Sequence, residues 1–139
     1  MYNRIMIPID GSVQAEHALD HAFGLAKALP GVSLTVVHVN PALTLNEPVV
    51  TGDIGGELER EGRNILERAA QKLVESSARH RVVSLNGDPA DAICKLAQEE
   101  QADLIVMGSR GVGLFSELML GSVSHAVAKH AHCPVLIVK

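Results

Sequence analysis

Aromatic side chains are almost absent from this 139-residue chain, which has one tyrosine, two phenylalanines and no tryptophan. Hydrophobic residues still make up 47% of the sequence, so the core must be aliphatic. Such a core suits parallel strands that are covered by helices. Cysteine is also scarce, and the spacing of Cys94 and Cys133 matches neither a redox CxxC motif nor a structural zinc site.

Basic blocks and long apolar runs are also missing. The formal net charge is −4, which argues against nucleic-acid binding through neutralised phosphates. No segment approaches the roughly 20 apolar residues of a membrane span, and the first residues show no signal-peptide pattern. We therefore expect a cytoplasmic protein of one domain, residues 1–139, with neither a nucleic-acid nor a membrane partner.

Predicted strands and helices alternate along the whole chain. The expected strands are 4–9, 33–39, 81–85, 103–107 and 133–138. The expected helices follow the capping residue Ser12 up to Pro30, and then span 57–79, 89–101 and 122–131, with Asp88 as a second cap. This order requires an α/β fold with an open parallel five-stranded sheet and helices on both faces. Local patterns leave the strand order open, and the long loop 42–56 is typical of a functional or mobile segment.

The most informative stretch lies between the predicted strand 103–107 and the last predicted helix. Gly108 is followed after two residues by Gly111, and after nine more by Gly121 and Ser122. A strand, a glycine-rich loop and a helix in this order form a phosphate site in many α/β proteins, because exposed N–H groups and the helix N-terminus attract anions. The stretch lacks the lysine of a Walker loop and the spacing of a dinucleotide fingerprint.

This loop resembles the nucleotide loop of the universal stress protein family, and the resemblance covers essentially the whole chain. Other matching stretches are 8–12, 38–39, 87–93, 102–111, 120–123 and 132–138. The resemblance implies a Rossmann-like fold, similar to adenine nucleotide alpha hydrolases, with strand order 3-2-1-4-5. It places a ligand crevice between the first and fourth strands. It also implies a homodimer through the last strand, Val135–Val138.

The loop glycines imply, by the same resemblance, that the chain belongs with the family members that bind ATP, here with Mg²⁺. Asp10 would then lie beside the ribose and adenine, in a slot lined by Pro8, Ile9 and Val39. The other binding residues implied are Met107, Gly108, Ser109, Arg110, Gly111, Gly121, Ser122, Val123 and Ser124.

Simpler interpretations of these residues remain open. Asp10 could only cap the first helix, the glycines could serve loop geometry alone, and Arg110 could be an ordinary solvated side chain. Two histidine groups could bind a metal, although neither has a recognised zinc pattern. These groups are His17 with His21, and the loose cluster of His125, His130, His132 and Cys133.

Three functions are compatible with this sequence. The first is a regulatory ATP-binding protein of the stress response, because the sequence has a phosphate loop but no clear catalytic apparatus. The second is a weak ATPase or phosphoryl-transferring enzyme, for which Asp10 and Arg110 are the only candidate residues. The third is a dimeric interaction module with a vestigial pocket.

Overall fold

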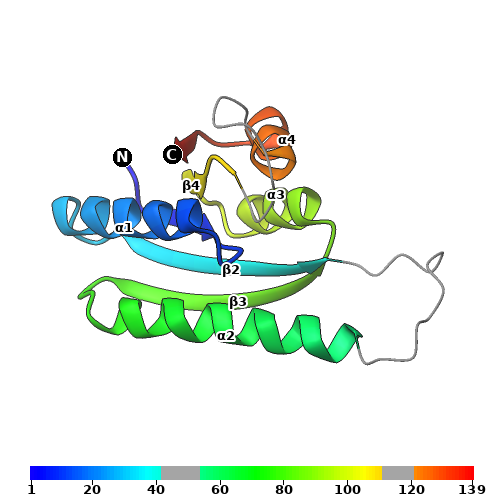
Figure 1. Cartoon of the computed structure of the whole chain (residues 1–139). Helices are drawn as coiled ribbons and strands as arrows, with labels where there is room; N and C mark the ends of the chain where they lie inside the picture. Colours follow the sequence, from blue (N-terminus) through cyan, green and yellow to red (C-terminus); the bar gives the residue numbers. More distant parts are fainter. Residues whose placement is uncertain (42–53, 111–120) are drawn as a thin grey trace.

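A parallel sheet forms the centre of the computed structural model, which describes residues 1–41, 54–110 and 121–139 (Figure 1). Its strand order is β3-β2-β1-β4-β5, as the resemblance implied. The strands are β1 (Arg4–Pro8), β2 (Ser33–Pro41), β3 (Arg79–Gly87), β4 (Leu104–Gly108) and β5 (Val135–Val138). The helices are α1 (Val13–Ala28), α2 (Ile54–Val74), α3 (Pro89–Glu99) and α4 (Ser122–His130).

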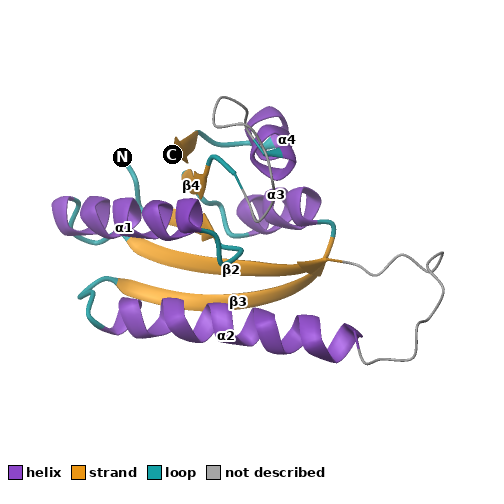
Figure 2. Ribbon diagram, in the orientation of Figure 1, coloured by secondary structure: helices purple, strands orange, loops and turns teal. Residues whose placement is uncertain are grey.

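Helices cover both faces of the sheet (Figure 2). Because successive side chains of a strand point to opposite faces, Ile5 and Ile7 of β1 pack with α1 and α2, whereas Met6 packs with α3 and α4. The two buried clusters are aliphatic, and Tyr2 and Phe23 only pack against the edge of the first. Among the described residues, no helix is long and apolar enough to cross a membrane.

The helix starts follow the predicted caps. The Ser12 hydroxyl accepts a hydrogen bond from the Ala15 N–H at 3.1 Å and begins α1. The Asp88 carboxylate accepts one from the Asp91 N–H at 3.0 Å and begins α3, with Pro89 in its first turn. Both capping predictions are therefore confirmed.

Several predicted boundaries were wrong, most clearly those of β2, β3 and α2. The strands β2 and β3 are both longer than expected, because they pair along their whole length, from Ser33 with Arg79 to Pro41 with Gly87. The helix α2 was predicted to span 57–79, but it starts earlier, at Ile54, and also ends earlier, at Val74. After this helix, the Ser76 hydroxyl accepts a hydrogen bond from the Ala78 N–H at 3.1 Å and turns the chain into β3. Of the predicted loop 42–56, residues 42–53 lie outside the described part.

Candidate functional site

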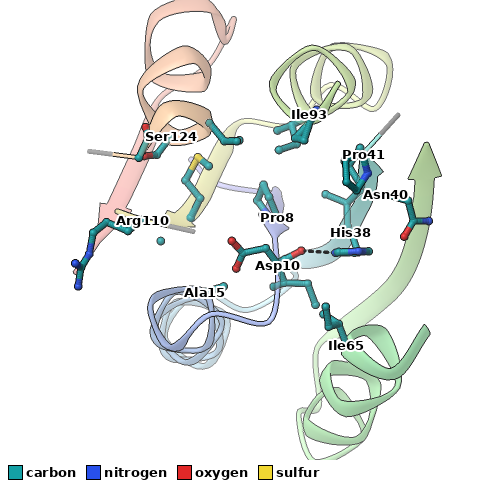
Figure 3. Close-up of a pocket in the computed structure, with 18 of the residues that line it drawn as sticks. Pro8, Asp10, Ala15, His38, Asn40, Pro41, Ile65, Ile93, Arg110 and Ser124 are labelled. Carbon is teal, nitrogen blue, oxygen red and sulfur yellow. Dashed lines mark hydrogen bonds between the residues drawn. The ribbon is translucent and has the colours of Figure 1, made fainter. Parts of the chain in front are cut away.

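A cavity of about 440 Å³ opens at the carboxyl ends of β1, β2 and β4 (Figure 3). Its volume falls in the range of small-molecule sites, roughly 300–1,000 Å³. This position is where open parallel sheets bind ligands, since β1 and β4 are neighbours from which the chain continues in opposite directions across the sheet.

The cavity brings together most of the residues that the resemblance assigned to a nucleotide site. Those that line it are Pro8, Ile9, Asp10, Val39, Met107, Gly108, Arg110, Gly121, Ser122, Val123 and Ser124. Ser109 lies behind the wall and does not line the cavity, and Gly111 lies outside the described residues.

Asp10 lies in the turn between β1 and α1. One carboxylate oxygen, Oδ1, accepts a hydrogen bond from the Ser12 N–H at 2.9 Å, which holds the side chain in a fixed orientation. In Figure 3 this carboxylate points away from His38 and towards the side of the pocket where Arg110 lies. Because Ser12 supplies the cap of α1, helix capping does not account for Asp10.

Ser109 joins the two ends of the glycine-rich loop. Its carbonyl oxygen accepts hydrogen bonds from the Gly121 N–H at 2.7 Å and from the Ser124 hydroxyl at 2.9 Å. Its own N–H donates to the Val138 carbonyl at 2.7 Å. The Ser124 side chain is buried in these contacts, so its hydroxyl positions the loop.

The N-terminus of α4 forms one wall of the cavity. Gly121 occupies the N-cap position with φ −64° and ψ 158°, and no side chain of the described residues caps the helix. Residues 121–124 all line the cavity. The positive end of the helix therefore borders this space and favours an anionic group there.

The opposite wall was not predicted from the sequence. His38 and Asn40 of β2 are buried beside α2, and both line the cavity. The Nδ1–H of His38 donates to the Ile9 carbonyl at 2.8 Å, which identifies the protonated ring nitrogen. A Cβ at Gly62 would lie 2.5 Å from Asn40 Oδ1 and 2.9 Å from His38 Cδ2. Gly62 thus allows α2 to approach β2, and a lone glycine inside a helical pattern was the available signal.

The histidines and cysteines of the described residues form neither a metal site nor a disulfide. Among the described residues, no three His, Cys, Asp or Glu side chains are grouped closely enough to hold a metal ion. Both cysteines are free thiols. Burial raises the pKa of Cys94, with a smaller contribution from Asp91, and burial and Asp103 raise the pKa of Cys133. Both groups are therefore protonated, weak nucleophiles at neutral pH.

Comparison with known proteins identifies the family. The model of the universal stress protein family matches residues 1–139. The universal stress protein YxiE of Bacillus subtilis is 38% identical, with full coverage of both chains. The solved structure of hypothetical protein MJ0577 from Methanocaldococcus jannaschii is 32% identical, covers 100% of this chain and 96% of its own, and superposes with a TM-score of 0.89.

Two further solved structures contain adenine nucleotides. An Archaeoglobus fulgidus universal stress protein in complex with dAMP is 28% identical, with coverage of 99% and 98% and a TM-score of 0.73. A universal stress protein in complex with cAMP is 27% identical, with coverage of 99% and 97% and a TM-score of 0.75. The full-length family match and the 38% identity to YxiE lead to one conclusion: this chain belongs to the universal stress protein family.

Proposed function

We propose that this chain binds ATP with Mg²⁺ in the cavity at the carboxyl ends of the strands, and acts as a regulatory protein of the stress response in the cytoplasm. The observation that carries the proposal is the wall formed by Gly108 and by residues 121–124 at the uncapped start of α4. Backbone N–H groups at such a wall favour phosphate. The dAMP and cAMP complexes of related proteins support an adenine nucleotide as the ligand.

The rest of the cavity suits the nucleoside part. Its apolar side chains come from β1 and the residue after it, and from β2, α2, α3 and β4; they include Ile9, Val39, Ile93 and Met107. We propose that they enclose the adenine and that the fixed carboxylate of Asp10 accepts hydrogen bonds from the ribose hydroxyls. Asp10 and the phosphate oxygens would also offer the hard oxygen ligands that Mg²⁺ prefers.

A regulatory role is favoured over catalysis by the charge of the cavity wall. Among the described residues, Arg110 is the only lysine or arginine that lines the cavity. Rapid phosphoryl transfer needs several cationic or metal-holding groups around the phosphates. We therefore propose that bound ATP acts as a signal and assign no catalytic residue.

The test is calorimetric titration of the purified chain with ATP and Mg²⁺, after mass spectrometry for co-purified nucleotide. We expect a Kd of about 10 μM or tighter, equivalent to about −7 kcal/mol. AMP should bind more weakly than ATP, because it leaves part of the phosphate wall unused. Equal affinities for AMP and ATP would contradict the phosphate assignment. If the chain neither binds ATP nor carries co-purified nucleotide, the dimeric interaction module is favoured. If it hydrolyses ATP within seconds, the ATPase or phosphoryl-transferring enzyme is favoured.

We further propose that the chain forms a homodimer through β5. This strand pairs with β4 along one edge, and Leu136 is a large apolar residue exposed on it. An apolar edge strand of this kind favours pairing with another strand.

The substitution Leu136→Asp should therefore convert dimers into monomers at micromolar concentration, as measured by light scattering after gel filtration. The matched control is Val82→Asp, because Val82 is a similarly exposed residue on β3 at the opposite edge of the sheet. A monomeric wild-type protein, or equal dissociation of both variants, would contradict a dimer through β5.

A further inference from the structure

A second hollow, of about 330 Å³, lies at the amino ends of the strands, whereas the nucleotide cavity lies at their carboxyl ends. It is formed where β1, β2 and β3 begin, together with the residue that follows α3. Because all the strands are parallel, their amino ends lie together at this end of the sheet and their carboxyl ends lie together at the other end. The residues that line it are Arg4, Ser33, Leu34, Thr35, Arg79, His80, Arg81 and Glu100.

The strand register places two arginines on the same face of the sheet. Arg4 of β1 is paired with Ser33 of β2, and Ser33 is paired in turn with Arg79 of β3. Paired residues of neighbouring strands point to the same face, and adjacent strands are about 4.8 Å apart. The two arginine Cα atoms therefore lie about 10 Å apart, with a serine between them.

The polar contacts leave this hollow with excess positive charge. Glu100 is the only acidic residue among the described residues that line the hollow. Its carboxylate forms an ion pair with Arg81 and accepts a hydrogen bond from the Thr35 hydroxyl at 3.1 Å. The Arg4 Nη1 donates to the Glu100 carbonyl oxygen at 2.7 Å, at the negative end of α3. Arg79 is exposed and has no ion-pair or hydrogen-bond partner for its side chain within the described ranges.

Asp103, a further carboxylate at this end of the sheet, is already engaged. It accepts hydrogen bonds from the N–H groups of Asn3 and Arg4 at 2.8 Å and 3.1 Å, and it does not line the hollow. The lining arginines thus exceed the lining carboxylate by two charges, although the whole chain has a net charge of −4.

We infer that this hollow is a second anion site, which takes a compact ligand with two or more phosphate groups. Arginine guanidinium groups hold phosphate through paired, charge-assisted hydrogen bonds, and here Arg79 is available to do so. A small ligand is favoured over a nucleic acid or an anionic membrane, because the acidic remainder of the surface repels an extended polyanion.

The test is titration of the full chain with inorganic pyrophosphate at low salt, followed by amide chemical shifts in NMR. We expect shifts at residues 33–35 and 79–81. The substitution Arg79→Gln should raise the Kd for pyrophosphate at these amides by about tenfold, as for the loss of a charged hydrogen bond. The matched control is Arg63→Gln, which removes an exposed arginine of α2 and should leave the Kd unchanged.

Two results would overturn the second site. Shifts confined to Asp10 and residues 121–124 would assign pyrophosphate to the nucleotide cavity alone, and would leave the proposed function intact. An equal Kd for Arg79→Gln and the wild type, or no shift at residues 79–81, would show that the arginines form an ordinary solvated surface. Failure of ATP binding would leave the second site unaffected, because the second site depends on residues at the amino ends of the strands.

Discussion

Replacement of Gly108 with alanine is expected to lower the free energy of unfolding by about 2–4 kcal/mol. Gly108 ends β4, directly beneath the first turn of α1. A Cβ at this position would lie 2.8 Å from the Gln14 carbonyl carbon and 2.9 Å from the Ala15 nitrogen. Both are backbone atoms of a helix that Ser12 caps, so relief of the overlap requires α1 to move away from β4.

Denaturant unfolding measures this effect, and Gly24→Ala is its matched control. Gly24 lies within α1, and a Cβ there would meet no atom within 4 Å. This control should raise stability by about 0.5–1 kcal/mol, because alanine is the better helix former. A loss below about 1 kcal/mol for Gly108→Ala would show that α1 and β4 separate easily. The glycine therefore has a packing role in addition to the proposed contact with phosphate.

Replacement of Gly121 with valine should reduce ATP affinity more than it reduces the stability of the fold. The backbone at Gly121 has φ −64° and ψ 158°, an extended conformation that a β-branched residue adopts without strain. Because Gly121 is buried, the added side chain should also lower the free energy of unfolding, but by less than it lowers the free energy of ATP binding. The valine side chain would obstruct the approach of phosphate to the N–H groups of α4 and lower the affinity at least tenfold, as for about one charged hydrogen bond.

Calorimetry with ATP and denaturant unfolding should be carried out on the same preparations of this variant. The matched control is Ala128→Val, an exposed alanine-to-valine change on the same helix α4, which should alter neither property by much. Losses of affinity and stability that are equal in free energy would show that Gly121 serves loop geometry alone. Such a result would remove the phosphate wall as the basis of the proposed function.

The outline of the fold was predictable because it depends on local patterns. Aliphatic runs, helical stripes and the caps Ser12 and Asp88 identify the elements and their alternation, which requires a parallel sheet. The strand order came from the family resemblance, since no local signal distinguishes one neighbour from another. The lengths of β2 and β3 were missed because strand pairing extends a strand beyond its apolar residues.

Most of the candidate site was also within reach, because the carboxyl ends of parallel strands meet at one edge. Two of its features were not. His38 and Asn40 line the cavity from β2, and the close approach of α2 to them, which Gly62 allows, has no local signal in their own part of the sequence. Ser109 supports the loop from behind, through contacts with Gly121, Ser124 and the end of β5.

The sequence by itself determined the family, the alternation of elements and the position of the glycine-rich loop, because each depends on residues that are close together in the chain or on a spacing kept along it. Only the tertiary structure decided that Gly108 must lack a side chain, since that requirement comes from the backbone of α1, more than 90 positions away. The same holds for Arg4 and Arg79, which become neighbours across Ser33 only when three strands pair in register.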